Sequence, residues 1–450
     1  MRILIYSYNY YPEPIGIAPL MTELAEGLVK RGHEVRVVTA MPNYPQREIY
    51  EAYRGKMFVE EEKNGVQIRR SFVWIRPQPN LLDRVMLDAS FVVTSFLPAL
   101  LGWRPDVILT TSPSLPGCVP AAALGGIFGC PVVLNLQDIL PDAAIHVGLI
   151  KSKFLIKVFT ALEKFSYRTA TKISVIADGF VDNLLKKGVK ASKMVQIPNW
   201  VDVNFIRPMP KEGNAFRETH NLQGKFVVQY SGNIALTQGL ETVVKAASKL
   251  RHIPDITFVI VGEASGLQRL QQECQDNGAD NVLLLPFQPR EKLPEMLAAA
   301  DVGLVVQKKN VISFNMPSKI QVLLASGRAL VASVPDNGTA ARAIRNSQGG
   351  VVVPPEDAEA LAAAILELYQ NPEQVNSLGY NSRKFAVENY SFDNALNQYE
   401  SLFNAVVKRN ISKPTPNMVR HPLTVAPAYE PVFYTVNDAE IRESKVVTKP

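Results

Sequence analysis

Cysteine is scarce in this chain of 450 residues, which holds Cys118, Cys130 and Cys274 and no others. Their number is odd and their spacing matches no metal-binding pattern, so neither a disulfide framework nor a zinc site is expected. Unpaired cysteines are typical of a reducing compartment. Since residues 1–7 are also too short an apolar run for a signal peptide, we expect a cytoplasmic protein.

A long uninterrupted apolar run is missing as well. Residues 85–103 are interrupted by Asp88 and Pro98, and residues 113–133 by several prolines and glycines. Neither stretch offers the run of about 20 apolar residues that crosses a bilayer. We predict buried helix and strand segments in both stretches, with a surface-attached helix as the alternative for residues 85–103.

A strong charge of one sign is absent too. The 48 basic and 42 acidic residues leave a net charge of +6, which permits an anionic ligand or a membrane surface and requires neither. No nucleic-acid partner is expected. With 47% hydrophobic residues the chain is globular, and its length predicts two domains.

The chain does contain an alternation of strand and helix patterns. An apolar strand over residues 2–8 is followed by a helix over 18–30 and a strand over 34–39. Further strands are predicted at 106–110, 131–136, 172–177, 226–231, 256–261, 282–285, 301–306 and 329–333. This order predicts an α/β fold of two doubly wound Rossmann-like domains that face a cleft.

Composition suggests where the domains begin and end. We predict a first domain over 1–203, a linker rich in proline, glycine and charge over 204–224, and a second domain over 225–390. A closing helix is predicted over 391–410. Residues 411–450 hold several prolines without a period and are predicted to form a disordered tail.

Residues 314–333 are the most informative stretch. Pro317 suits the first turn of a helix, and Gly327 ends that helix before a buried strand. Ser318 and Lys319 therefore lie at the helix start, beside free backbone N–H groups. A hydroxyl, a cation and a positive helix end together favour a phosphate ligand. The alternative is a capped helix with a solvated lysine.

Two loops that follow strands hold further candidates. Asp138 comes directly after the predicted strand 131–136, where it could hydrogen bond a sugar hydroxyl or transfer a proton. A turn or helix N-cap aspartate is the alternative. Gly16, in the loop after the first strand, could let a ligand approach the backbone, or it could be a plain turn glycine.

Residues 151–172 form a predicted amphipathic helix with many lysines. Phe154, Val158 and Phe165 fall on one side of it. Such a helix could lie on an anionic membrane. We favour the alternative, in which the apolar side faces the core and the lysines are solvated.

Eight short motifs follow one another along residues 1–408. They are Tyr10-Tyr11-Pro12-Glu13-Pro14-Ile15-Gly16, Arg31-Gly32-His33-Glu34-Val35, Gln137-Asp138-Ile139-Leu140-Pro141-Asp142, Ile197-Pro198-Asn199-Trp200-Val201-Asp202, Ser231-Gly232-Asn233, Pro317-Ser318-Lys319, Ala325-Ser326-Gly327-Arg328 and Gly349-Gly350-Val351-Val352-Val353-Pro354-Pro355. Each motif is weak alone. The ordered set resembles the retaining GT-B glycosyltransferases of family 4, and within them the bacterial branch that makes colanic acid, exopolysaccharides and O-antigen.

This resemblance implies a hexosyltransferase with retention of configuration and no metal or other cofactor. The first domain would bind a saccharide acceptor, usually lipid-linked, at the inner face of the plasma membrane, and the second a nucleotide-sugar donor. Lys319 would neutralise charge on the leaving phosphate, and Asp138 is the second catalytic candidate. The donor-binding positions that the resemblance implies are Gly16, Gly232, Asn233, Gln238, Gly262, Glu263, Phe287, Lys308, Asn315 and Ser318.

The sequence departs from the family at four positions. Phe314 and Val322 replace two common glutamates, and Asn233 and Gln238 replace a common basic pair. We favour an active enzyme because Lys319 and the glycines remain. A catalytically degenerate GT-B partner protein and a GT-B sugar-nucleotide epimerase are the alternatives. A dehydrogenase is disfavoured, because no G-x-G-x-x-G follows the first strand.

Overall fold

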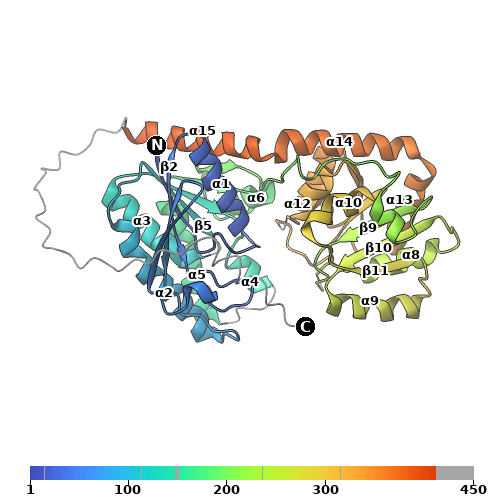
Figure 1. Cartoon of the computed structure of the whole chain (residues 1–450), viewed down its shortest axis with the longest axis horizontal. Coiled ribbons are helices and arrows are strands. Elements are labelled where there is room, and N and C mark those ends of the chain that lie inside the picture. Colours follow the sequence, from blue (N-terminus) through green and yellow to red (C-terminus); the bar gives the residue numbers. More distant parts are fainter. Residues whose placement is uncertain (15, 113, 147–151, 236, 315, 412–450) are drawn as a thin grey trace, which may run out of the picture. The chain divides into compact units, whose positions relative to one another are not determined.

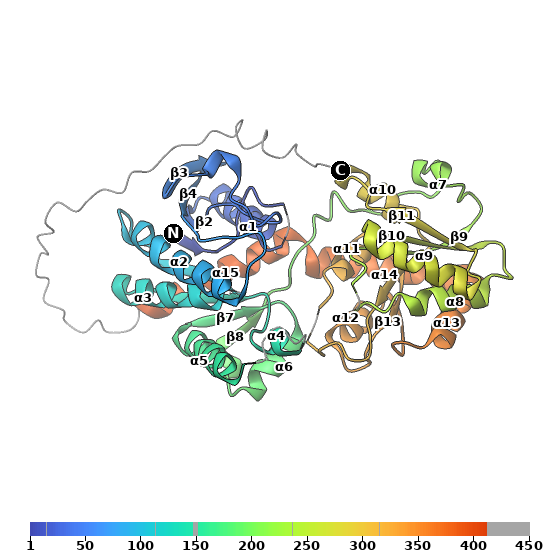
Figure 2. The same cartoon turned by 90° about the horizontal axis from the view of Figure 1, so that it is seen from below.

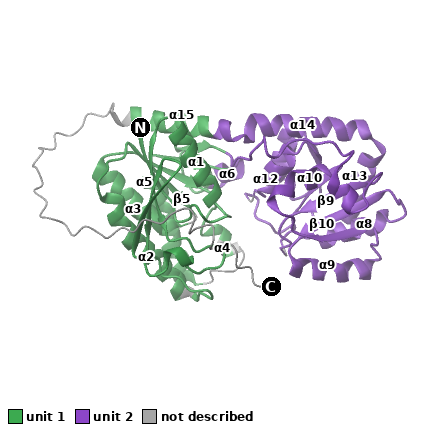
Figure 3. Ribbon diagram, in the orientation of Figure 1, with its two compact units in different colours: residues 1–176, 184–197, 396–450 green, residues 177–183, 198–395 purple. Residues whose placement is uncertain are grey.

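The computed structural model describes residues 1–411 except 15, 113, 147–151, 236 and 315. The chain forms two compact units (Figure 3): unit 1 comprises residues 1–176, 184–197 and 396 onward, and unit 2 comprises residues 177–183 and 198–395. Apart from Ile411, the tail that the sequence predicts to be disordered lies outside the described residues.

Unit 1 is built on a sheet of eight strands within the described residues (Figure 1). The strands are β1 (Arg2–Tyr6), β2 (Glu34–Ala40), β3 (Phe58–Lys63), β4 (Val66–Ser71), β5 (Val107–Ser112), β6 (Val132–Leu136), β7 (Lys172–Val175) and β8 (Met194–Gln196). Their order is β3-β4-β2-β1-β5-β6-β7-β8, and every pair is parallel except β3 with β4. The strand order therefore reverses between β1 and β5.

Helices cover both faces of this sheet. They are α1 (Ala18–Lys30), α2 (Leu81–Leu100), α3 (Cys118–Phe128), α4 (Asp142–His146), α5 (Lys153–Thr169), the end of α6 (Asp178–Lys186), from Leu184 on, and the later part of α15 (Phe392–Ile411). Leu4 and Tyr6 of β1 pack with Phe91 of α2 and Leu124 of α3. On α15, Glu400 pairs with Arg31 at the end of α1, at 2.7 Å.

Unit 2 holds a sheet of six parallel strands in its described part. They are β9 (Phe226–Ser231), β10 (Ile256–Gly262), β11 (Val282–Pro286), β12 (Val302–Val306), β13 (Ala329–Ser333) and β14 (Gly350–Val353). Their order is β11-β10-β9-β12-β13-β14. Counted from β9, this is the 3-2-1-4-5-6 order of a doubly wound sheet, with its reversal between β9 and β12.

Two buried clusters sandwich the second sheet. Besides the larger, first part of α6 and the beginning of α15, the helices of unit 2 are α7 (Ala215–Thr219), α8 (Glu241–Leu250), α9 (Ala264–Asn277), α10 (Leu293–Ala298), α11 (Lys319–Ala325), α12 (Thr339–Ser347), α13 (Ala358–Gln370) and α14 (Pro372–Tyr390). Val228 and Tyr230 of β9 pack with α8, α9 and α13, whereas Val227 packs with α10, α11, α12 and α14. The prediction of two doubly wound Rossmann-like α/β domains is confirmed.

The segment 204–224, predicted as a linker, packs on unit 2. It contains α7, whose Arg217 is buried and donates to the Asp301 carboxylate at 2.6 Å. Asp301 immediately precedes β12 and also accepts from the backbone N–H of Val227 in β9, at 2.8 Å. The segment therefore helps to hold the two central strands together.

Three features of unit 1 differ from the predicted elements. The antiparallel hairpin of β3 and β4, at the sheet edge (Figure 2), has no counterpart among the predicted strands. Residues 85–100 belong to the single helix α2, and its outer residues are exposed rather than buried. On α5, Phe154, Val158 and Phe165 are exposed, so the favoured core-facing orientation is wrong. No helix among the described residues is long and apolar enough to cross a membrane.

Candidate functional site

In unit 2, the loops that follow β9 and β12 meet where the strand order reverses. Doubly wound sheets bind ligands at this position, beyond the carboxyl ends of the strands. The backbone N–H of Lys308, after β12, donates to the carbonyl of Thr237, in the loop after β9, at 2.9 Å. A Cβ added to Gly239 would come within 3.0 Å of the Lys308 side chain. The structure thus brings Lys308 together with the loop that carries the predicted positions Gly232, Asn233 and Gln238.

Gly232 begins this loop with a backbone that requires glycine. Its φ of +141° lies in a region that other residues rarely adopt. A Cβ at this position would lie 3.0 Å from Nζ of Lys319. The close approach of Gly232 therefore leaves its backbone directly against the amine at the start of α11.

The Lys319 amine has an unusual environment. Its Nζ lies 3.5 Å from the centroid of the Tyr230 ring, is shielded from solvent and has no hydrogen-bond partner among the described residues. Burial lowers the pKa of Lys319 to about 7. The Tyr230 hydroxyl donates to the Asn233 carbonyl at 2.7 Å, which ties the ring to the same loop. A buried cation without a counter-ion favours an anionic ligand.

Gly262, the last residue of β10, and Glu263, directly after it, fix the far side of the loop. Both carboxylate oxygens of Glu263 accept from the backbone N–H of Ile234, at 2.9 and 3.1 Å. A Cβ on Gly262 would lie 2.4 Å from the Ile234 side chain, so no larger residue fits there without rearrangement. In this structure the Glu263 carboxylate binds the protein's own loop.

The other donor positions predicted in this domain lie on several different segments. The side-chain oxygen of Gln238 is buried and has no partner among the described residues, whereas Asn233 is exposed. Ser318 precedes α11 without a side-chain capping bond, so the alternative of a capped helix is not what the structure shows. Phe287 follows the edge strand β11 and is 54% exposed. Asn315 lies outside the described residues.

Phe314 and Val322, which replace two glutamates of the family, serve packing. The Phe314 ring is buried and contacts the Phe180 ring edge-on, with centroids 5.8 Å apart. Val322 packs on the cluster beneath α11. Both positions therefore contribute apolar contacts where the family carries charge.

In unit 1, Glu13 organises the loop after β1, a role that sequence reasoning missed. Its carboxylate accepts from the backbone N–H of Asn43 at 2.8 Å and of Tyr44 at 2.9 Å, and from the Asn9 amide at 2.7 Å. Burial raises the pKa of Glu13. Gly16, further along the loop, has a φ of +71° and open space around it, which is compatible with a ligand or with a plain turn.

Asp138 lies just past the carboxyl end of β6, as predicted. It is partly buried, which raises the pKa of its carboxyl group. One oxygen accepts from the backbone N–H of Ile139 at 2.8 Å. This local bond is the one expected of a turn aspartate.

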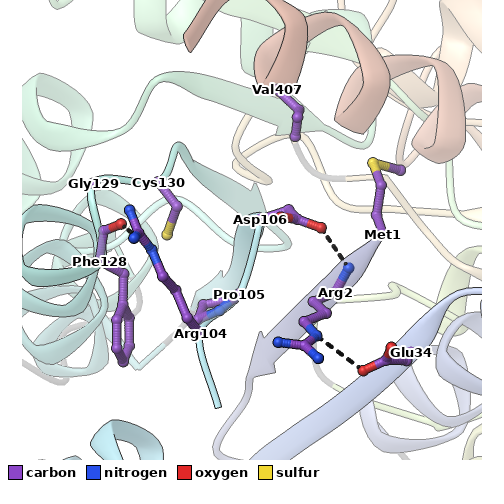
Figure 4. A pocket seen from close by; sticks show the side chains of 10 residues that line it. All are labelled: Met1, Arg2, Glu34, Arg104, Pro105, Asp106, Phe128, Gly129, Cys130 and Val407. Atoms are coloured by element: carbon purple, nitrogen blue, oxygen red, sulfur yellow. Dashed lines mark hydrogen bonds and ion pairs between the residues drawn. The ribbon is translucent and has the colours of Figure 1, made fainter. Parts of the chain in front are cut away.

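A cavity of 660 Å³ opens at the amino-terminal edge of the unit 1 sheet (Figure 4), opposite to the carboxyl edge at which Asp138 lies. Its charged groups largely satisfy one another: Arg2 pairs with Glu34 at 3.1 Å, and the Arg2 backbone N–H donates to Asp106 at 2.7 Å. Arg104 donates to the carbonyl of Phe128 at 2.9 Å. Since ligands of doubly wound sheets bind at the carboxyl edge, we do not assign the active site here.

Comparison with known proteins identifies the family. Residues 16–200 match the glycosyl transferase 4-like domain, and residues 213–385 match the glycosyl transferases group 1 domain. The putative colanic acid biosynthesis glycosyl transferase WcaI of Escherichia coli is 33% identical over 89% of this chain and 98% of its own length. The probable glycosyltransferase WbjE of Pseudomonas aeruginosa is 25% identical over 65% of this chain and 70% of its own length.

Solved structures agree on the fold. Sucrose-phosphate synthase from Thermosynechococcus elongatus superposes with a TM-score of 0.69 at 19% identity, over 91% of this chain and all of its own. HepE of Anabaena, solved with UDP, superposes with a TM-score of 0.67 at 18% identity, over 90% of this chain and all of its own. The two matched domains and the full-length relative show that the chain belongs to the GT-B glycosyltransferases of family 4, in the branch that makes bacterial exopolysaccharides such as colanic acid.

Proposed function

We propose that the protein transfers a hexose from a nucleotide-sugar donor to a lipid-linked saccharide acceptor, with retention of configuration and without a metal ion. Unit 2 binds the donor and unit 1 the acceptor. The observation that carries the proposal is the Lys319 amine, which is buried beside Gly232 where the strand order of the second sheet reverses and has no hydrogen-bond partner in the described part of the chain. The structural neighbour HepE was solved with UDP and with UDP-glucose, which supports a nucleotide-sugar at this kind of site.

The chemistry places negative charge where Lys319 can stabilise it. As the bond from the anomeric carbon to the donor phosphate breaks, charge develops on the leaving diphosphate. The acceptor hydroxyl forms the new glycosidic bond, and its proton passes to the leaving phosphate. A fixed ammonium in a water-poor site stabilises this charge without reorganisation. In this proposal the same cation takes the place of a metal ion.

Direct binding of a nucleotide-sugar panel tests the proposal. We expect isothermal titration calorimetry to show selective binding of one UDP- or GDP-sugar, with the same Kd in magnesium and in EDTA. No binding of any donor by folded protein would favour a degenerate partner, which the packing roles of Phe314 and Val322 make the main rival. Isomerisation of the donor without any acceptor would instead identify an epimerase.

Peripheral membrane contact is the second part of the proposal. Helices α2, α3 and α5 pack side by side on unit 1, and their outer surface is apolar and basic. On α2 the exposed apolar residues share one helical face: Leu82, Val85, Met86, Ala89, Val93 and Leu97. The exposed Arg84 lies on another face of the same helix. On α5 the exposed residues include Lys153, Phe154, Lys157, Val158, Lys164 and Phe165.

Acidic groups are missing from this surface. Within the described residues of the three helices no carboxylate is exposed, since Asp83 and Asp88 are partly buried and Glu163 is buried. Val93 is 73% and Phe154 72% exposed, which is costly in water but not in an interface of lipid headgroups and chains. An anionic membrane surface complements both properties.

Charge reversal tests the membrane contact. We expect the protein to co-sediment with vesicles of phosphatidylglycerol and phosphatidylcholine, and less with phosphatidylcholine alone. Changing Lys153, Lys157 and Lys164 to Glu should weaken binding about hundredfold, at about 1 kcal/mol for each lysine. The matched control reverses Lys245, Lys249 and Lys292 of unit 2. Equal binding by both triple variants would contradict the proposal.

A further inference from the structure

A small cavity lies where the strand order of unit 1 reverses. It occupies 210 Å³ beyond the carboxyl ends of β1 and β5, the position at which doubly wound sheets bind ligands. Its walls come from three elements: Tyr8 and Asn9 after β1, Thr111 and Ser114 at and after the end of β5, and Asp88 on α2. The volume is below the range of about 300–1,000 Å³ usual for whole ligands, which suits one ring of a larger molecule.

The wall has the composition that a sugar ring requires. Leu87 and Ile17 supply apolar surface for the C–H face of a ring, and the other lining residues supply hydroxyl, amide and carboxylate groups. Several of these polar groups are held by the protein itself. The Thr111 hydroxyl is 2.9 Å from that of Ser7, and the Tyr8 hydroxyl accepts from the Asn43 amide at 3.3 Å. They form a fixed surface rather than a flexible one.

Asp88 is the charged group of this cavity. Its carboxylate accepts one long hydrogen bond, from the Ser114 hydroxyl at 3.3 Å, and no cation pairs with it among the described residues. Burial raises the pKa of Asp88 to about 6, because little water reaches the carboxylate. An ionised carboxylate has about four acceptor sites, so most of its hydrogen-bonding capacity remains for a ligand.

We propose that this cavity is the subsite for one monosaccharide unit of the acceptor and that Asp88 accepts a hydrogen bond from a hydroxyl of that sugar. The inference rests on the proposed function and names the residue that selects the acceptor. A carboxylate without a cation partner, in a small polar cavity, can accept hydrogen bonds from a pair of sugar hydroxyls. Within one helical turn of Asp88, α2 presents exposed apolar residues of the surface that we assign to the membrane, where a lipid-linked sugar resides.

Binding of simple glycosides tests the subsite without any donor. We propose a panel of octyl glycosides of common hexoses, followed by saturation-transfer NMR. At least one glycoside should bind the wild type, and Asp88→Asn should weaken it about 10- to 100-fold, since a charge-assisted bond is lost. Ser114→Ala should weaken it less. Asp106→Asn, in the larger cavity at the opposite edge (Figure 4), is the matched control and should bind normally.

The outcomes separate this inference from the proposed function. Unchanged glycoside binding by a folded Asp88→Asn protein, or loss of binding in Asp106→Asn instead, would overturn the subsite. Titration of the nucleotide-sugar is measured on the same variants and should be unaffected. If the donor binds and Asp88→Asn alters neither glycoside binding nor acceptor-dependent nucleotide release, the subsite fails while the transferase proposal stands. If no donor binds, the transferase proposal itself fails.

Discussion

Replacing Lys319 by methionine is expected to lower turnover by about 10²–10³-fold, the range for loss of one preorganised group that stabilises developing charge. The variant keeps an apolar side chain of similar length and removes the amine, which lies over the Tyr230 ring and has no hydrogen-bond partner among the described residues. Because the lost amine satisfies no other group, we expect the fold to be unaffected. Initial rates of nucleotide release with a cognate donor measure the effect.

A lysine of the same unit serves as the control for this prediction. Lys245 on α8 is exposed, and Lys245→Met removes the same charge. Its turnover should match the wild type. If Lys319→Met also retains near-normal turnover while remaining folded, Lys319 has no part in the mechanism and the degenerate-partner alternative gains weight.

The pH dependence of donor binding tests the same amine. The pKa of Lys319 is lowered to about 7, so in the free protein the amine loses its proton as pH rises through 7. A diphosphate prefers the charged amine, so donor affinity should be highest below pH 7 and fall by up to about tenfold per pH unit above it. Lys319→Met lacks this proton and should show a flatter profile from pH 6.5 to 9.

The fold follows from the sequence because its strands are nearly continuous apolar runs. Parallel strands are buried on both faces, and Phe226–Ser231 and Ala329–Ser333 are observed as predicted. The β3–β4 hairpin could not be found this way. Phe58–Lys63 carries three consecutive glutamates, and Glu61 is buried only because Arg70, from β4, pairs with it. That pairing is a tertiary contact, which no local sequence pattern predicts.

Only part of the candidate site can be predicted from the sequence. A lysine at a helix start beside a glycine loop can be predicted, and the structure places Lys319 against Gly232. Tyr230 contacts the Lys319 amine because strand β9 and helix α11 are neighbours in the fold, so the spacing of residues in the sequence does not predict this contact. Asp88 looks in the sequence like an interruption of an apolar run. Its role emerges when the strand order places α2 beside the ends of β1 and β5.

Replacing Arg217 by methionine is expected to destabilise unit 2 by about 2–3 kcal/mol, since it removes the more buried of the two cations that pair with the Asp301 carboxylate and leaves only Lys211. Arg217 is 6% exposed and also donates to the carbonyls of Ala299 and Lys225, at 2.8 and 3.1 Å. Urea unfolding followed by circular dichroism measures the loss. Arg345→Met, which breaks an exposed pair with Asp336, should cost less than about 1 kcal/mol.

The double variant Arg217→Met/Asp301→Asn then tells whether charge is the cause. If the loss of half of the charge compensation at Asp301 dominates, with Lys211 as its remaining partner, the double variant should lose less stability than Arg217→Met alone. A purely additive result would assign the effect to lost packing and carbonyl contacts instead. The distinction bears on function, because Asp301 joins β12 to β9 at their amino ends through Val227. Lys308 joins the loops after the same two strands at their carboxyl ends through Thr237. The loop that holds Gly232 against Lys319 is therefore anchored on a strand pair that the segment 204–224 keeps in place.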